Sequence, residues 1–251
     1  MRSTRQIPRI KHRPLPRRVI DVLSSPPRLL PSLGIEDDYT TLSYCWGGPQ
    51  NLKLTTKNKT DYCHRLLVEK LPQTIKDAID ITRKLQIPYL WIDSMCILQD
   101  DEKEKALDIA NMGEVYHKCT VTIVGANAST ADEGILMPRI SEESQIRSPL
   151  CLPDFDNKMI PVTLSQLPTP NSYFTNNPIE SCGWTLQKRL LSPRMLIYST
   201  TNVRWLCNSL EDYDGGNRKM LGSHSMPHLS TLSSSVKSAQ MWQSIVSKFS
   251  R

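Results

Sequence analysis

YLWIDSMCIL, residues 89–98, is the stretch of sequence that decides the fold. It is almost continuously apolar, which is typical of a β-strand that is covered on both faces. A helical pattern of apolar residues precedes it from Pro72, and another follows it from Asp100. Further strands are predicted at residues 39–46 and 120–126. This alternation of strands and helices is the signature of right-handed βαβ crossovers and a parallel sheet.

The two helices are placed by their ends and by the spacing of their apolar residues. Pro72 suits a first helical turn, where an N–H would be unpaired anyway, and this helix is expected to end before Pro88. Asp100 is the predicted N-cap of the second helix. The predicted core faces are Ile75, Ala78, Ile79, Thr82 and Leu85 in the first helix, and Ala106, Ile109, Ala110, Gly113 and Tyr116 in the second.

Shorter elements are predicted around this centre. Residues 18–23 form a candidate first strand, residues 184–191 a short helix, and residues 195–200 and 203–207 two strands that suit a hairpin. The predicted fold class is α/β, with a mostly parallel central sheet, flanking helices and a C-terminal β-containing extension. The predicted domain covers residues 15–207, with a basic disordered leader at 1–14, a flexible Ser/Gly-rich loop at 208–240 and a helical segment at 241–251.

Composition and charge exclude several classes of protein. The 251 residues are 39% hydrophobic and 22% charged, as in a globular protein. Seven of the 31 lysines and arginines lie in residues 1–18, which hold no acidic residue. Residues 19–251 therefore carry 24 basic and 25 acidic residues. The chain after residue 18 is therefore almost neutral, and no specific nucleic-acid partner is expected. The chain also lacks an apolar run long enough to span a membrane and a secretory leader.

The cysteine pattern favours reduced thiols in the cytoplasm. The chain holds seven cysteines, an odd number, and no Cys-x-x-Cys motif. Zinc sites and disulfide frameworks usually show paired, closely spaced cysteines. Neither a metal site nor a disulfide framework is therefore predicted.

Six ordered blocks of sequence resemble the HET (heterokaryon-incompatibility) domain family of fungi. The blocks are LPRRVIDV at 15–22, YTTLSYCWGG at 39–48, LPQTIKDAIDITRKL at 71–85, YLWIDSMCILQDD at 89–101, MGEVYHKCTVTIVGANAS at 112–129 and GWTLQKRLLSPRMLIY at 183–198. The resemblance implies an α/β fold remotely similar to TIR domains. It also implies a signalling role in fungal programmed cell death and innate immune-like responses, through self-association or an upstream receptor-type protein. Residues 241–251 resemble a segment late in that family's domain, so the domain is expected to end prematurely.

Three positions depart from the pattern of that family. The family usually has Arg and Glu where this chain has Cys182 and Lys188, and an aromatic residue where it has Lys105. Loss of a guanidinium at 182 and a carboxylate at 188 could break an ion pair or a catalytic constellation. An inactive, degenerate HET paralogue is therefore one alternative.

Candidate site residues follow two predicted strands. Ligands of open parallel sheets lie beyond the carboxyl ends of the strands. We expect the two groups to share one rim: Ser43, Tyr44, Trp46, Gly47 and Gly48 after one strand, and Asp93, Ser94, Cys96 and Gln99 after the other.

Two carboxylates are the candidate catalytic groups. Asp93 lies within an apolar run, so it requires a partner, a ligand or a shifted pKa. It is either a ligand-orienting or acid–base group, or an acid that accepts main-chain N–H groups at the next helix. Glu114 could support the positive charge of an oxocarbenium-like transition state, or it could lie on a solvated helix face.

The other candidates also have two interpretations each. Trp46 could stack on a base or nicotinamide ring, or pack in the core beside a turn. Arg189 and Arg194 could clamp a phosphate or carboxylate, or form salt bridges to Asp93, Asp100 or Asp101. Cys96 could be a nucleophile, but a buried cysteine at a strand end is usually inert.

Three functions follow from these residues. The first is a signalling module that requires no cofactor. The second is a TIR-like enzyme that hydrolyses NAD, with NAD as substrate and Asp93 or Glu114 stabilising the ribosyl cation. The third is a thiol hydrolase that uses Cys96.

Overall fold

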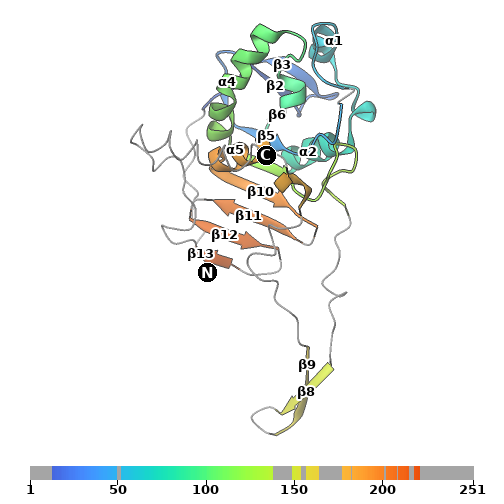
Figure 1. Cartoon of the computed structure of the whole chain (residues 1–251), viewed down its shortest axis with the longest axis vertical. Coiled ribbons are helices and arrows are strands. Elements are labelled where there is room, and N and C mark those ends of the chain that lie inside the picture. The colour runs from blue at the N-terminus through green and yellow to red at the C-terminus, as the bar shows by residue number, and fades with distance from the viewer. Residues whose placement is uncertain are drawn as a thin grey trace.

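The computed structural model describes residues 13–49, 52–137, 149–153, 157–163, 177–181, 183–200, 202–207, 209–214 and 218–220. In this part of the chain the centre is a nine-stranded sheet in the order β13-β12-β11-β10-β7-β5-β6-β2-β3 (Figure 1). Its strands are β2 (Arg18–Asp21), β3 (Arg28–Pro31), β5 (Tyr39–Ser43), β6 (Tyr89–Trp91), β7 (Val121–Gly125), β10 (Arg194–Tyr198), β11 (Val203–Cys207), β12 (Leu210–Tyr213) and β13 (Arg218–Met220).

The sheet is mixed, which corrects the expectation of a mostly parallel sheet. The four central strands β6, β5, β7 and β10 run parallel. Strands β2 and β3 at one edge, and β11, β12 and β13 at the other, pair antiparallel. Helices lie between the central strands along the chain, whereas a few residues join β2 to β3 and β10 to β11, and so short a connection can only produce an antiparallel neighbour.

Helices cover both faces of the sheet. Successive residues of β5 point to opposite faces, so their contacts identify the layers. Thr40 Oγ1 lies 2.8 Å from Thr82 Oγ1 in α2 (Gln73–Lys84). The Tyr39 hydroxyl donates over 2.8 Å to the Val115 carbonyl in α4 (Glu102–Lys118). Helix α5 (Gly183–Leu191) packs against α4.

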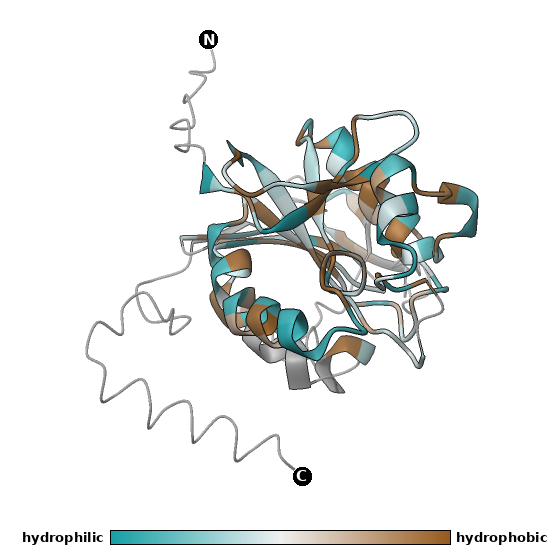
Figure 2. Cartoon of the chain, turned by 90° about the horizontal axis from the view of Figure 1, so that it is seen from above, coloured by the Kyte–Doolittle hydropathy of each residue, from teal (hydrophilic) through white to brown (hydrophobic). Residues whose placement is uncertain are grey.

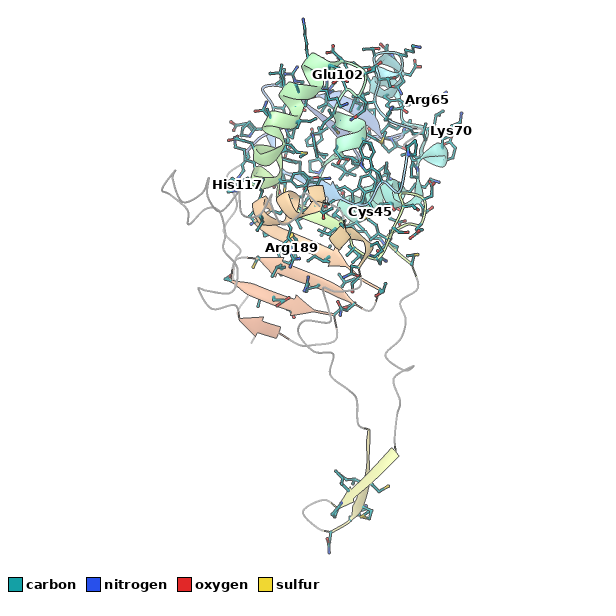
Figure 3. All side chains as sticks on the ribbon, in the orientation of Figure 1. Cys45, Arg65, Lys70, Glu102, His117 and Arg189 are labelled. Atoms are coloured by element: carbon teal, nitrogen blue, oxygen red, sulfur yellow. The ribbon has the colours of Figure 1, made fainter. Side chains whose placement is uncertain are left out.

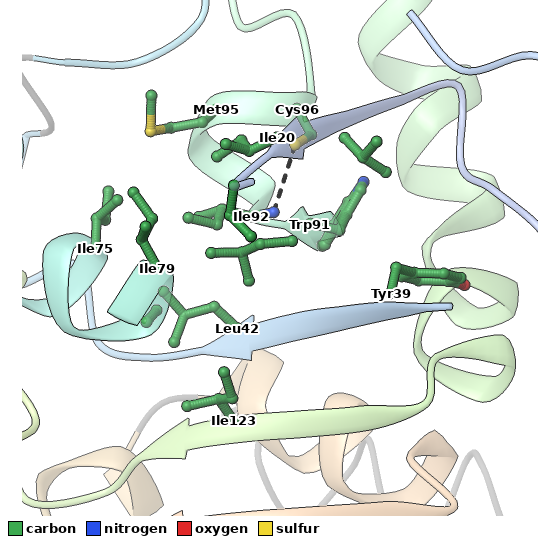
Figure 4. Close-up of a cluster of buried hydrophobic side chains, with 14 of the residues drawn as sticks. Ile20, Tyr39, Leu42, Ile75, Ile79, Trp91, Ile92, Met95, Cys96 and Ile123 are labelled. Carbon is green, nitrogen blue, oxygen red and sulfur yellow. Dashed lines mark hydrogen bonds between the residues drawn. The ribbon is translucent and has the colours of Figure 1, made fainter. Parts of the chain in front are cut away.

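Apolar side chains fill the space between α2 and the sheet. Leu42 of β5 lies beneath Ile75 and Ile79 of α2, and Ile123 lies on the neighbouring strand β7 (Figure 4). The predicted face of α2 is confirmed at four of its five positions, because Ile75, Ala78, Ile79 and Thr82 are buried and Leu85 is 39% exposed.

Smaller elements complete the described chain. They are the helices α1 (Lys59–His64) and α3 (Asp93–Cys96), the short 3-10 helices η1 (Val68–Lys70) and η3 (Pro178–Ser181), and two small sheets. One small sheet pairs β1 (Arg13–Pro14) with β4 (Glu36–Asp37), and the other pairs β8 (Pro149–Pro153) with β9 (Met159–Thr163).

The stretch at residues 89–98 is not one strand. Strand β6 ends at Trp91, and Asp93 begins the helical turn α3.

The N-cap of α4 is Asp101 rather than Asp100, since the Asp101 carboxylate accepts the N–H groups of Lys103 and Glu104. Asp100 instead accepts the Thr56 N–H and hydroxyl.

The predicted core face of α4 is wrong in its first half. Ala106, Ile109 and Ala110 are exposed, and the buried residues are Met112, Val115 and Tyr116. Figure 2 shows hydrophilic and hydrophobic residues mixed along this helix. The first half turns Glu104 and Asp108 inward instead, toward the buried guanidinium of Arg18. An ion pair, which apolar periodicity does not detect, therefore sets the rotation of the helix.

The two ends of the predicted domain differ from expectation where the structure describes them. Strands β12 and β13 lie inside residues 208–240, where a flexible loop was expected. Arg13 and Pro14, assigned to the leader, form strand β1. Residues 1–12 and the predicted helical segment at 241–251 lie outside the described residues.

Candidate functional site

Trp46 and Asp93 meet at the carboxyl edge of two neighbouring parallel strands. Strands β5 and β6 pair in parallel, so the residues that follow them emerge at the same edge. The indole Nε1 of Trp46 donates a hydrogen bond over 3.3 Å to Asp93 Oδ1. The expected shared rim is thus present for these two residues.

Asp93 binds both a main-chain amide and a buried cation. Its Oδ1 accepts the Ser94 N–H over 2.8 Å, and its Oδ2 accepts from Lys188 Nζ over 2.7 Å. The side chains of Asp93 and Lys188 are only 13% and 4% exposed. The cationic partner is thus Lys188, a position noted for departing from the family pattern, and not Arg189 or Arg194.

Aromatic residues surround this ion pair. Lys188 Nζ lies 5.6 Å from the centroid of the Tyr116 ring, close enough for a cation–π interaction. The Tyr116 hydroxyl donates over 2.9 Å to the Leu42 carbonyl, and the ring packs edge-on against Trp91. Burial, together with the negative charge of Asp93, raises the pKa of Tyr116 well above its ordinary value. We call Asp93, Lys188, Trp46 and Tyr116 the Asp93 cluster.

Tyr44 and Ser94 form a second contact across the same edge. Their hydroxyl oxygens lie 2.8 Å apart, and both residues are buried. Burial raises the pKa of Tyr44, and the charge of Asp93 raises it further. Tyr44 is therefore a neutral hydrogen-bonding group beside the Asp93 cluster.

Gly47 serves the packing of two loops rather than the approach of a ligand. Its φ of +73° suits glycine, and a Cβ atom at this position would lie 2.4 Å from Thr130 Cγ2. The Ala131 N–H donates over 3.3 Å to the carbonyl of Trp46. Gly48, with a φ of +138°, has open space where a Cβ would stand.

The remaining residues of the predicted rim are buried or hold the turn of α3. Ser43 and Cys96 are each 2% exposed. Burial raises the pKa of the Cys96 thiol to about 12, and a thiol that stays protonated is a poor nucleophile. The Gln99 amide donates to the carbonyls of Asp93 and Ile97. This geometry favours the structural interpretation of Cys96.

Glu114 is not part of the Asp93 cluster. Its side chain is 67% exposed and forms an ion pair with Lys118 one turn further along α4. A hydrogen bond from Lys118 lowers its pKa. Glu114 lines a surface cavity of about 260 Å³ whose lining includes Tyr39, Asp108 and Asn111 but neither Asp93 nor Trp46.

The two predicted anion-binding arginines lie on different elements. Arg189 is half-buried on α5, directly after Lys188 (Figure 3). Arg194 begins β10, and its Nε donates over 2.6 Å to the Thr120 carbonyl. Arg194 therefore ties β10 to the start of β7, away from the carboxyl edge.

Asp77 is a buried acid that the sequence analysis did not select. It is 5% exposed, and its Oδ2 accepts the N–H groups of Ile135 and Leu136 over 2.6 and 3.0 Å. Its Oδ1 accepts from the Gln73 amide over 2.7 Å. The signal for it was present, since Asp77 lies between apolar residues on the buried face of α2. It anchors the loop that follows β7.

Comparison with known proteins assigns the family. The model of the family described as Heterokaryon incompatibility protein (HET) matches residues 39–188, which span the chain from β5 to Lys188. This chain belongs to the HET family. The match covers the Asp93 cluster of this HET domain, because Trp46, Asp93, Tyr116 and Lys188 all lie within it.

A curated relative carries the same designation. The HET domain is 25% identical over 114 residues to heterokaryon incompatibility protein 6, OR allele, of Neurospora crassa. That alignment covers 43% of this chain but only 17% of the length of the Neurospora protein. No solved structure matches the chain.

Two features are absent from the described residues. Among these residues, no three or more His, Cys, Asp and Glu side chains are grouped so that they could hold a metal ion. The helices in the same part of the chain include none with the length and apolar character that crossing a bilayer requires.

Proposed function

We propose that this HET domain is a signalling module of fungal heterokaryon incompatibility whose output is programmed cell death. The observation that carries the proposal is the family match over residues 39–188. The designation of the Neurospora relative as a heterokaryon incompatibility protein supports the same assignment. The module acts in the cytoplasm, as part of an innate immune-like response, and requires no cofactor.

The geometry of the Asp93 cluster supports signalling rather than catalysis. The carboxylate of Asp93 is already neutralised by Lys188 at 2.7 Å, and the second candidate acid, Glu114, is exposed and paired with Lys118. An enzyme that stabilises a cationic transition state needs a carboxylate aimed at the reacting centre. In this chain the buried carboxylate of Asp93 is instead paired with the ammonium of Lys188.

Self-association or an upstream receptor-type protein would activate such a module. Helix α4 carries apolar residues on its exposed side, where Leu107 is 55% and Ile109 is 37% exposed. The exposed Ala106 and Ala110 lie between these two residues around the helix, so the four form one apolar face, and such a face favours protein–protein contact. We therefore place the contact with a second copy or a receptor on the first half of α4.

Inducible expression in a filamentous fungus tests the signalling function. Induction of the wild-type chain is expected to cut colony viability at least tenfold, whereas a Leu107→Asp, Ile109→Asp variant should stay viable. A Lys84→Asp variant, which changes the net charge by the same amount at an exposed position of α2, is the matched control and should kill like the wild type. Full viability with the folded wild-type protein would contradict a cell-death output.

NAD hydrolysis is the second candidate function, and the strand order favours it. Numbered along the chain, the four parallel strands lie in the order 2-1-3-4, as do the first four strands of flavodoxin-like sheets. This order supports the remote TIR-like resemblance. Trp46 and Asp93 also lie at the carboxyl edge, where such sheets bind nucleotides.

The Lys188→Glu variant distinguishes two hypotheses: that this chain is an active NAD-hydrolysing enzyme, and that it is a degenerate copy of one. Purified wild-type, Lys188→Glu and Lys188→Glu, Asp93→Asn proteins would be incubated with NAD at several protein concentrations, and nicotinamide release measured by chromatography. Release by the wild type supports the enzyme. Release by Lys188→Glu alone, lost again with Asp93→Asn, supports a degenerate copy that was inactivated at position 188. No release by any variant leaves the signalling function in place and excludes hydrolysis of NAD.

A further inference from the structure

We propose that Asp93, Trp46 and Tyr116 of the Asp93 cluster form a binding site for a primary organic ammonium group, and that Lys188 is the internal occupant of that site. The inference concerns the chemistry of the site and does not depend on cell death as the output. It assigns the site a ligand class and assigns Lys188 the role of a competitor that the chain carries itself.

The surroundings of Lys188 Nζ select a cation. A carboxylate oxygen lies 2.7 Å away on one side, and the face of an aromatic ring lies 5.6 Å away on another. The side chain of Lys188 is 4% exposed, so little water screens these interactions. A carboxylate combined with an aromatic ring is the arrangement by which proteins recognise ammonium groups.

The walls of the site are fixed independently of Lys188. The Asp93 carboxylate is oriented by the Trp46 indole and the Ser94 N–H. The Tyr116 ring is held by the bond from its hydroxyl to the Leu42 carbonyl and by its edge contact with Trp91. A site whose walls keep their geometry without the ligand is preorganised to bind.

Lys188 itself is attached to the site by few interactions. Among the described residues, Asp93 Oδ2 is the hydrogen-bond partner that its ammonium has, although an ammonium carries three donors. Lys188 also comes from α5, 95 residues away along the chain from the edge where Asp93 lies. Because Lys188 belongs to the same chain, it competes with any external ammonium at a high effective concentration. An external ammonium therefore enters when the lysine side chain leaves or is removed.

Chemical rescue of Lys188→Ala tests the proposal. The substitution deletes the lysine side chain from Cγ to Nζ, a fragment that n-propylammonium matches in length and charge. Thermal unfolding would be followed with propylammonium chloride against sodium chloride at equal ionic strength. At ten times its Kd, propylammonium should raise the Tm of Lys188→Ala by roughly 3–6 °C and leave the wild type unchanged. Neutral 1-propanol should not do so.

Two further variants make the result specific to the ammonium site. Lys188→Met fills the space without a charge and should show no rescue. Lys188→Ala, Asp93→Asn keeps the space without the carboxylate and should respond equally to propylammonium and 1-propanol. The proposal is overturned if propylammonium stabilises Lys188→Ala no more than 1-propanol does, or stabilises Lys188→Met equally.

Refolding covers the case in which Lys188→Ala does not fold by itself. The urea-unfolded variant would be diluted into propylammonium chloride or sodium chloride, and the folded fraction measured by size-exclusion chromatography and near-UV circular dichroism. At least a threefold larger folded fraction with propylammonium supports the ammonium site. Equal folded fractions in both salts overturn it.

Discussion

Gly47 packs directly against Thr130, so closely that a Cβ atom added to Gly47 would lie 2.4 Å from Thr130 Cγ2 and 2.6 Å from Thr130 Cα. This contact joins the turn after β5 to the loop after β7 and fixes the position of the neighbouring Trp46. The glycine is therefore required by sterics as well as by its φ of +73°.

The Gly47→Ala substitution should destabilise the domain by more than backbone strain alone. Strain at positive φ costs about 1–2 kcal/mol, and forcing a methyl group into packed atoms adds about 1–3 kcal/mol. Gly34 is the matched control, because its φ is +83° and no atom lies within 4 Å of a Cβ there. Urea titration of both alanine variants isolates the steric cost. Equal free energies of unfolding would contradict the contact with Thr130.

Asp77 should control the order of the loop that follows β7. Removing its carboxylate leaves two buried N–H groups, those of Ile135 and Leu136, without their acceptor, at about 1–3 kcal/mol each. Asp77→Ala should therefore speed hydrogen exchange at these two amides at least tenfold. Asp80→Ala, in the same helix but 58% exposed and paired with Arg83, should not. Unchanged exchange in Asp77→Ala would show that other contacts anchor the loop.

Arg18 and Arg17 bind the same two acids but should differ in their energetic contribution. Arg18 is 3% exposed, donates over 2.7 Å to the Cys96 carbonyl and also binds Glu104 and Asp108. Arg17 is 38% exposed. Breaking a buried ion pair costs about 3–5 kcal/mol, whereas an exposed one contributes about 0–1 kcal/mol. Arg18→Met should therefore lower the free energy of unfolding by several times as much as Arg17→Met, measured by urea titration. Equal losses would count against this ranking.

The sequence predicted the elements that depend on periodicity and on local breakers. The buried face of α2 and the strands β5, β7 and β11 lie where alternation and spacing placed them, within a few residues. Parallel pairing of β5 and β6 also followed from the helix between them, and it brought Trp46 to Asp93. Local pattern was sufficient because apolar burial decides these elements.

What the sequence did not predict depends on pairs of residues that lie far apart in the chain. The rotation of α4 follows from Arg18, which lies 86 and 90 residues before Glu104 and Asp108. Strand β12 forms because β11 offers it an edge, and β13 forms because β12 does, although both strands are polar in sequence. The sequence pointed to Arg189 or Arg194 as the cationic partner of Asp93, whereas its partner in the structure is Lys188. Polar pairing over long distances carries no periodic signal.

Alkaline pH should unfold the domain through its buried thiols and phenols. Burial raises the pKa of Cys96 to about 12 and also raises the pKa values of Cys119, Tyr39 and Tyr116. In the unfolded chain thiols lose their protons near pH 8.5 and phenols near pH 10. Above these values the unfolded state binds fewer protons than the folded state, so stability falls as pH rises.

The pH window and its control follow from the same linkage. The contribution of Cys96 is complete below about pH 8.5 and is lost between there and its folded pKa of about 12, with a slope approaching about 1.4 kcal/mol per pH unit. Urea titrations from pH 7 to 10.5 should therefore give a flat free energy of unfolding up to pH 8 and a decline above pH 9. Cys96→Val removes one titrating group, so its decline between pH 9 and 10 should be shallower by about that slope. A Cys96→Val curve parallel to the wild type would show that the Cys96 thiol ionises equally in both states, and hence that solvent reaches it in the folded domain.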